Sequence, residues 1–212
     1  MTRSGAVSPD LDTFSIVVVC TGNVCRSPIA EQLLRDRLSS AGVPVMVGSA
    51  GTRALVGQPM TREAAEQVSE YGTTPTPHRA RQLTAELVQA ADLILTASRD
   101  HRAEVVSLAP SASRRTFTLR EFTRIVHSVA DRESGEPHTP EAEAGSPRAA
   151  LRSYVDRMAA NRGYAQPPAR AIDDDIDDPY QQSKQVYRRS AGIIHEAVTT
   201  ITAGLASARG GA

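Results

Sequence analysis

The feature that most constrains this chain is a short aliphatic stretch that leads directly into a tight loop and a helix start. Residues 15–20 read SIVVVC, a β-branched run of the kind that forms a buried parallel strand. A turn containing Gly22 and Asn23 follows. Ser27 and Pro28 then favour a helix start, since Ser is a good N-cap and Pro is preorganised for the first turn. The sequence therefore predicts a strand, a loop and a helix N-terminus in immediate succession.

The rest of the chain alternates between strand and helix patterns. Further strands are expected at residues 45–47, 93–95 and 115–118, and helices at 61–71, 84–90 and 100–108. A long amphipathic helix is expected at 183–205. Such alternation is typical of an α/β fold. We expect a three-layer sandwich, in which a central parallel sheet of about four strands has helices on both faces and a phosphate-binding loop after the first strand.

The length of 212 residues suits one α/β domain. We expect residues 1–14 to be a flexible N-terminal segment and residues 15–212 a single domain. Between residues 127 and 172 the alternation breaks and five prolines occur, which predicts an insertion that is partly helical and partly mobile. Ser146-Pro147 could open a helix in it. The insertion is either a plain surface excursion or a segment that shapes the site.

Charge and composition limit the classes of partner. Lys plus Arg and Asp plus Glu number 24 each, so the chain lacks the positive surface of a nucleic-acid binder. The longest aliphatic run, residues 16–19, is too short to span a bilayer, and residues 1–12 lack the apolar stretch of a signal peptide. The two cysteines do not resemble a secreted disulfide scaffold. We expect a cytoplasmic protein that neither binds nucleic acid nor inserts into membranes.

The loop itself is suited to holding an oxyanion. Unpaired N–H groups and the dipole at a helix N-terminus attract anions, and Gly22 and Asn23 tolerate the backbone angles that a curled loop needs. Arg26 offers two parallel donors to phosphate oxygens. Cys20 would lie at the bottom of this cradle, where donors favour the nucleophilic thiolate and Ser27 could donate to the sulfur. Arg26 and the backbone supply the positive charge, so we expect no metal or organic cofactor.

Transfer of a phosphoryl group from a monoester also needs a proton donor for the leaving oxygen. Asp178 is the candidate, because Pro179 fixes a turn that could present it. The alternative is that residues 172–178 form an acidic, solvated loop without a role in catalysis.

These elements together resemble a known family. Cys-x5-Arg-Ser at the first helix, in the string CTGNVCRSP, and the late Asp-Pro-Tyr are similar to the low-molecular-weight protein tyrosine phosphatases. Residues 49–51, 78–83 and 91–95 match further, so that the resemblance covers about residues 15–125 and 172–206. The string ALVG at 54–57 resembles the bacterial branch associated with exopolysaccharide export. The eukaryotic-like branch has aromatic residues near Leu55 and at Gln181, which leaves Tyr180 as the main surface for stacking a substrate ring.

The resemblance implies hydrolysis of phosphotyrosine in proteins through a cysteinyl-phosphate intermediate. Cys20 would be the nucleophile, Arg26 would hold the phosphate, and Asp178 would protonate the leaving group and then activate water. The implied substrate-binding residues are Thr21, Gly22, Asn23, Val24, Cys25, Ser27, Leu55 and Tyr180. Ser49 and His78, together with Asn23, would support the loop. The implied partner is a phosphotyrosine protein such as an autophosphorylating bacterial tyrosine kinase.

Three other functions remain as alternatives. Protein-arginine phosphatases resemble this chain except for a Thr at the position of Val24. Arsenate reductases of the same fold need two further cysteines downstream, whereas both cysteines here lie in the loop. A phosphate-binding adaptor without activity would not need Asp178.

The second loop cysteine, Cys25, has two interpretations. It either packs beneath the loop as a small residue or forms a reversible disulfide with Cys20 that protects the nucleophile from irreversible oxidation.

Overall fold

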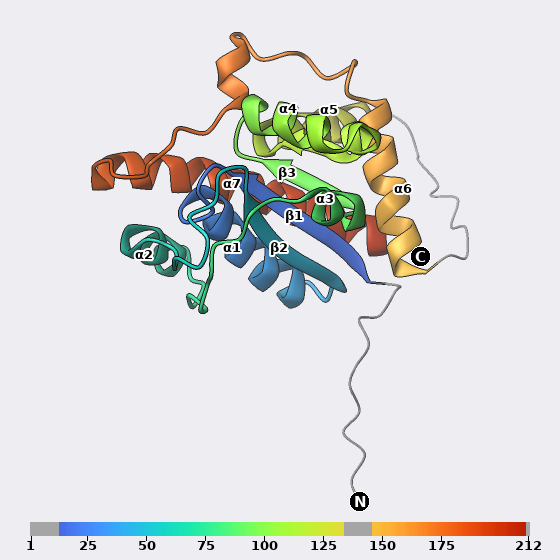
Figure 1. The fold of residues 1–212 in the computed structure, drawn as a ribbon. Coiled ribbons are helices and arrows are strands. Elements are labelled where there is room, and N and C mark those ends of the chain that lie inside the picture. Colours follow the sequence, from blue (N-terminus) through green and yellow to red (C-terminus); the bar gives the residue numbers. More distant parts are fainter. Residues whose placement is uncertain (1–12, 134–145, 211–212) are drawn as a thin grey trace, which may run out of the picture.

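A four-stranded parallel sheet runs through the middle of the protein (Figure 1). The structure is a computed structural model that describes residues 13–133 and 146–210. Its strands are β1 (Phe14–Cys20), β2 (Val45–Gly51), β3 (Leu93–Thr96) and β4 (Thr116–Thr118), in the order β2-β1-β3-β4. Helices cover both faces of this sheet. The predicted three-layer α/β sandwich with its loop after the first strand is confirmed.

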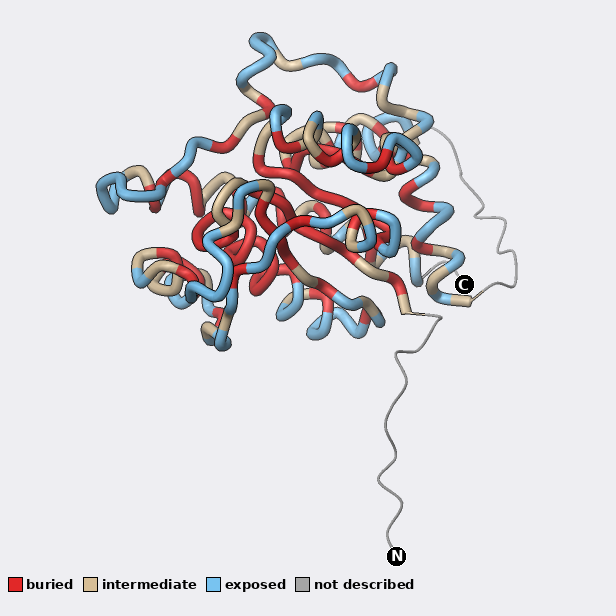
Figure 2. The backbone as a smooth tube through the Cα atoms, viewed as in Figure 1, coloured by how far each residue is buried: buried red, intermediate tan, exposed pale blue. Residues whose placement is uncertain are grey.

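Alternating side chains of β1 enter two separate cores, as the two-residue period of a strand requires. Phe14, Ile16 and Val18 pack against α1 (Arg26–Ser40), α5 (Leu119–Glu133), α6 (Pro147–Ala160) and α7 (Lys184–Gly210). Val17 and Val19 pack against α3 (Ala85–Ala90), α4 (Arg99–Leu108) and the 3-10 helix η1 (Pro110–Arg115). Figure 2 shows the strands largely buried and the outer faces of the helices exposed.

The predicted helices begin within about one residue of the expected positions, whereas α5 was not predicted. Thr61, Thr84 and Ser98 each accept a backbone N–H at the start of α2 (Arg62–Glu70), α3 and α4. Helix α1 begins at Arg26, one residue before the expected Ser27, and its N-cap residue has no side-chain cap. The hydroxyl of Ser27 is used in the site described below.

The segment predicted as an insertion, residues 127–172, contains more helix than expected. Helix α5 continues to Glu133, and Ser146 caps α6 as the Ser-Pro pair predicts. The chain then passes over α4 and α5 to the 3-10 helix η2 (Ala171–Asp174) before it reaches α7 (Figure 1). Residues 134–145, which include part of the predicted mobile portion, lie outside the described residues. So do residues 1–12 of the predicted flexible N-terminal segment, whereas Phe14 already belongs to β1.

Helix α6 is tied to the sheet through one buried carboxylate. Asp92, just before β3, accepts the backbone N–H of Ser15 at 2.9 Å. The same carboxylate pairs with Arg148 at 3.1 Å and with Arg152 at 2.9 Å, both on α6. Apolar residues of α6 join the same core as α5 and α7: Leu151, Tyr154, Val155 and Met158. Within the described ranges, no helix combines the length and the apolar character needed to cross a membrane.

Candidate active site

The carboxyl edge of the sheet brings three distant segments together, as parallel α/β sheets generally do at the ends of their strands. The loop at residues 20–26 leaves β1, and Ala97 and Ser98 follow β3. The segment after η2 is hydrogen-bonded to this edge, since the N–H of Ile176 donates to the carbonyl of Ala97 at 2.9 Å. The Asp175 carboxylate accepts the N–H of Arg99 at 2.7 Å. The candidate acid residue, Asp178, is thereby placed beside Arg26 of the loop.

Asn23 shapes the loop. Its φ of +57° lies in the left-handed region, which Asn tolerates better than most residues. The side-chain oxygen of Asn23 accepts a hydrogen bond from the N–H of Arg81 at 2.9 Å, and its backbone carbonyl accepts one from His78 Nε2 at 2.7 Å. These bonds from the chain after α2 hold the loop in a conformation that it would not otherwise favour. The structure thus brings the predicted supporting residue His78 to the loop.

A chain of hydrogen bonds leads from a buried carboxylate to the sulfur of Cys20. Ser49 Oγ donates to the Glu31 carboxylate and accepts from Asn23 Nδ2 at 2.7 Å. Asn23 Nδ2 also donates to Ser27 Oγ at 2.9 Å. Since Ser27 Oγ accepts that bond, its own proton is free to point at Cys20 Sγ, 3.0 Å away. The arrangement supplies a donor to a thiolate at Cys20.

Arg26 lies between the loop and the segment before α7. Its buried guanidinium donates to the carbonyl of Ile176 at 3.0 Å and to Thr21 Oγ1 at 3.3 Å. It also forms an ion pair of 2.6 Å with the exposed carboxylate of Asp178. The N–H of Tyr180 donates to Asp178 Oδ1 at 3.2 Å, which closes the turn expected at Pro179. The sequence-predicted Cys20, Arg26 and Asp178 therefore meet at one place.

The remaining predicted substrate-binding residues divide into rim and core. Leu55 and Tyr180 are exposed, and the Leu55 N–H donates to the carbonyl of Gly22 at 3.0 Å, which places Leu55 on the loop. The side chains of Val24 and Cys25 are buried in the core and do not form part of the exposed rim.

The sulfur of Cys25 contacts two hydroxyl groups. It lies 3.3 Å from Tyr187 Oη on α7 and 3.6 Å from Thr61 Oγ1. Burial raises the pKa of the Cys25 thiol, while the hydrogen bonds from Tyr187 and Thr61 oppose the shift. Both cysteines are free thiols. The disulfide between Cys20 and Cys25 stays a prediction.

Sequence reasoning missed two residues of this site, Glu31 and His101. Glu31 falls on the same helical stripe as Leu34 and Leu38, and a lone acid on an apolar stripe was the available signal. His101 is buried, and its Nε2 lies 2.8 Å from Thr21 Oγ1. No local pattern distinguishes it from an ordinary histidine on a helix.

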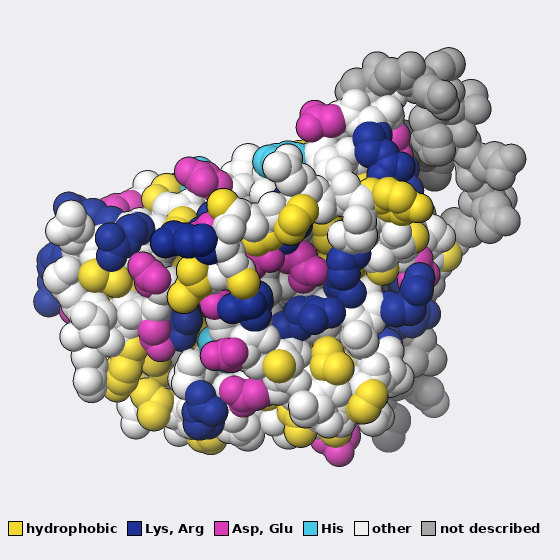
Figure 3. All heavy atoms as spheres, turned by 90° about the horizontal axis from the view of Figure 1, so that it is seen from above, with side chains coloured by type: hydrophobic (Ala, Val, Ile, Leu, Met, Phe, Trp, Pro, Cys, Tyr) yellow, Lys and Arg dark blue, Asp and Glu magenta, His cyan; other side chains and the backbone are white. Residues whose placement is uncertain are grey.

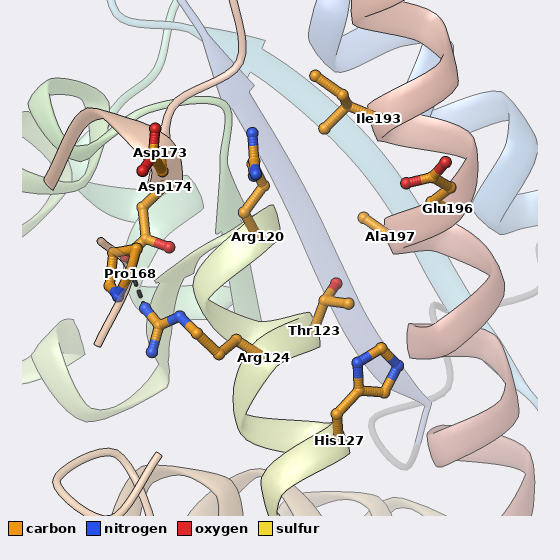
Figure 4. Close-up of a pocket in the computed structure, with 10 residues that line it drawn as sticks. All are labelled: Arg120, Thr123, Arg124, His127, Pro168, Asp173, Asp174, Ile193, Glu196 and Ala197. Atoms are coloured by element: carbon orange, nitrogen blue, oxygen red, sulfur yellow. Dashed lines mark hydrogen bonds and ion pairs between the residues drawn. The ribbon is translucent and has the colours of Figure 1, made fainter. Parts of the chain in front are cut away.

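A separate cavity of about 310 Å³ lies between α5, α7 and the chain around η2 (Figure 4). Three of its charged residues form ion pairs: Arg124 pairs with Asp174 at 2.6 Å, and Asp173 pairs with Arg170 at 2.8 Å. Loop residues 20–27 do not line it. This cavity is therefore separate from the loop that follows β1.

The described residues form no broad basic patch on the face shown in Figure 3, so the positive charge for an anion at the loop comes from Arg26. On the face seen in Figure 3, basic and acidic side chains are interspersed and do not form a patch of one sign. Among the described residues, His, Cys, Asp and Glu form no group of three or more that could hold a metal ion. Arg26 and the loop N–H groups are thus the features of this site that suit a phosphate.

Comparison with known proteins identifies the family. Residues 15–158 match the model for low molecular weight phosphotyrosine protein phosphatase. The chain is 45% identical over 108 residues to the low molecular weight protein-tyrosine-phosphatase Etp of Escherichia coli K12, an alignment that covers 51% of this chain and 70% of Etp.

Two solved structures share the fold over nearly the whole chain. Vibrio vulnificus Wzb in complex with benzylphosphonate has a TM-score of 0.61 and 26% identity, and the match covers 90% of this chain and 98% of Wzb. The YwlE arginine phosphatase of Geobacillus stearothermophilus has a TM-score of 0.62 and 26% identity, with 92% and 94% covered. Since the family model spans more than half of the sequence, the chain belongs to the low molecular weight phosphotyrosine protein phosphatase family.

Proposed function

We propose that this protein is a protein-tyrosine phosphatase that hydrolyses phosphotyrosine through a cysteinyl-phosphate intermediate. The observation that carries the proposal is the meeting of Cys20, Arg26 and Asp178 at one loop. Cys20 Sγ lies 3.0 Å from the Ser27 hydroxyl, and Arg26 lies 2.6 Å from Asp178. This arrangement supports the proposal that Cys20 is the nucleophile, Arg26 the cation that binds phosphate and Asp178 the acid.

In the first step, the loop N–H groups and Arg26 hold the three equatorial oxygens of the phosphate. The Cys20 thiolate attacks phosphorus, so that the S–P bond forms while the bond to the phenolic oxygen breaks. Asp178 donates its proton to that oxygen, which avoids expulsion of a phenoxide. The Asp178 carboxylate that results stays close to Arg26, which stabilises its charge.

In the second step, Asp178 takes a proton from water, and the water oxygen attacks phosphorus. The S–P bond breaks and inorganic phosphate is released. The leaving sulfur carries the electron pair, and the hydroxyl of Ser27 stabilises it by donating a hydrogen bond.

The test is release of para-nitrophenol from para-nitrophenyl phosphate under reducing conditions without added metal. We expect turnover by the wild type and none by Cys20→Ser. Asp178→Asn should lose about 10²- to 10⁴-fold in kcat, the usual contribution of a general acid. Asp177→Asn is the matched control, because Asp177 is an exposed neighbour whose carboxylate lies 3.6 Å from Arg189. Equal effects at positions 177 and 178 would contradict the assignment of the acid.

Phosphotyrosine is the proposed substrate because an exposed aromatic residue stands at the acid turn. Tyr180 follows Asp178 and can stack on a phenyl ring, and Leu55 supplies an apolar rim on the loop side. The relative Wzb was solved with benzylphosphonate, an aromatic phosphonate. These features favour an aryl phosphate.

Phosphoarginine is the second candidate, since the fold is shared with an arginine phosphatase. A comparison of phosphotyrosine and phosphoarginine peptides, with wild type and Val24→Thr, separates the two. We expect the wild type to prefer phosphotyrosine, and comparable turnover of both peptides would overturn that preference.

The proposed partner is an autophosphorylating bacterial tyrosine kinase, with the encounter taking place in the cytoplasm, where Cys20 stays reduced. A Cys20→Ser variant that retains binding should trap phosphotyrosine proteins and release them on addition of inorganic phosphate. Capture that persists when phosphate is added would argue against binding through the loop.

A further inference from the structure

His101 is a buried histidine of helix α4 that contacts the loop following β1. It lies in the first turn of α4 and is 4% exposed. Its Nδ1 lies 2.6 Å from Ser98 Oγ, and its Nε2 lies 2.8 Å from Thr21 Oγ1. Both ring nitrogens therefore have hydroxyl partners, one at the N-cap of α4 and one on the loop that follows β1.

The Thr21 hydroxyl connects this histidine to Arg26. Thr21 directly follows Cys20, and its Oγ1 accepts a hydrogen bond from Arg26 Nη2 at 3.3 Å. A guanidinium only donates, whereas a hydroxyl can accept from it and still bond to an imidazole. Either neutral tautomer of His101 completes the chain Ser98–His101–Thr21–Arg26.

The ring is suited to this place only when it is neutral. Burial, together with the nearby charge of Arg26, lowers the pKa of His101 to about 4. An uncharged imidazole supplies a hydrogen bond without repelling the guanidinium that has to hold the phosphate. A lysine or arginine here would place a second fixed cation next to Arg26.

We propose that His101 is a positioning residue for the phosphatase reaction: it holds the Thr21 hydroxyl, which in turn orients the Arg26 guanidinium toward the phosphate. The inference rests on the proposed function of the loop. The simpler role for His101 is packing at the start of α4, where its backbone N–H donates to Ser98 Oγ at 3.4 Å. The two roles differ in whether the Nε2 contact matters.

Two substitutions at position 101 separate the positioning role from the packing role, because only one of the new side chains is long enough to contact Thr21. His101→Asn places an amide where Nδ1 was, so it keeps a partner for Ser98 but does not reach Thr21. His101→Gln places its amide near the position of Nε2 and reaches Thr21. Thr21→Val removes the hydroxyl at nearly constant shape and leaves the histidine in place. His127→Gln, an exposed histidine on α5, is the matched control.

Two quantities are measured for each folded variant: kcat/KM for para-nitrophenyl phosphate, and the affinity for inorganic phosphate by calorimetry. We expect His101→Asn and Thr21→Val each to weaken phosphate binding and kcat/KM by about tenfold, because each disturbs the contact between Thr21 and the charged Arg26, and loss of one hydrogen bond to a charged group has about that effect. Because both act through one contact, the double variant should lose no more than either single variant. His101→Gln should recover most of the loss, and His127→Gln should match the wild type.

Wild-type phosphate affinity in His101→Asn or Thr21→Val would overturn the proposal. So would a double variant that loses the product of the two single effects, or a Gln variant as impaired as the Asn variant. The calorimetric measurement does not depend on turnover, so an inactive wild type would refute the proposed function while the role of His101 in binding phosphate is still decided. If the buried substitution at 101 prevents folding, a Thr21→Val variant with wild-type phosphate affinity would still overturn the proposal, because the chain from His101 to Arg26 runs through the Thr21 hydroxyl.

Discussion

Ser27→Ala tests the link between loop geometry and chemistry most directly. The substitution removes one oxygen from a completely buried residue and adds no volume. It deletes the donor that lies 3.0 Å from Cys20 Sγ. Asn23 Nδ2 loses this acceptor but keeps Ser49 Oγ at 2.7 Å, so the hydrogen-bonded support of the loop is mostly retained.

The size of the effect follows from the charge on sulfur. Cys20 must carry negative charge both as nucleophile and as leaving group, and hydrogen bonds to charged groups contribute about 1.5–3 kcal/mol. That range corresponds to a loss of about 10- to 100-fold in rate. The effect on stability should be smaller than the effect on the reaction barrier. The free energy of unfolding should fall by about 1 kcal/mol, the net contribution of a neutral hydrogen bond.

The assay is steady-state hydrolysis of para-nitrophenyl phosphate, combined with rapid-quench measurement of the first turnover. Loss of the sulfur's donor should slow breakdown of the cysteinyl phosphate, so that a burst of para-nitrophenol precedes a slower steady state. Ser39→Ala, an exposed serine near the end of the same helix, is the control. A Ser27→Ala enzyme with kcat within about twofold of wild type would refute the reasoning, since that difference is under 0.5 kcal/mol.

Three further predictions concern stability and redox behaviour. Asp92→Asn should lower the free energy of unfolding in urea by about 1–3 kcal/mol, because the buried carboxylate holds both Ser15 and α6; an unchanged denaturation midpoint would argue against that role. The pKa of His101 is lowered to about 4 in the folded protein, so the unfolded state binds the proton more readily. The contribution of neutral His101 to stability is therefore complete above about pH 6.5 and is lost as the pH falls toward 4. Wild type should therefore lose up to about 3 kcal/mol more than His101→Asn over that window in pH-dependent urea melts, and parallel curves would contradict this. Cys25→Ser should recover less activity than wild type when thiol is added after peroxide; equal recovery would remove the predicted disulfide with Cys20 and leave Cys25 as a packing residue bonded to Tyr187.

The local part of the site was readable from the sequence because its signals are adjacent along the chain. An aliphatic strand, a Gly-Asn turn and a helix start within residues 15–28 imply an anion-binding loop from backbone physics alone. The positions of Cys20 and Arg26 follow from that loop. The same holds for α6, whose Ser-Pro start and apolar spacing were sufficient to predict a helix.

The supporting contacts were decided by the tertiary structure. The strand order β2-β1-β3-β4 places the end of β3 beside the loop after β1, which brings His101 to Thr21 across 80 residues. The carbonyl of Ile176 reaches Arg26 across 150 residues in the same way. Such pairs leave no periodic pattern, since each depends on where two strands end and not on neighbouring residues. The sequence by itself determined which residues could carry the chemistry, and the parallel sheet determined which others hold them in place, because only the assembled carboxyl edge brings distant segments within hydrogen-bonding distance.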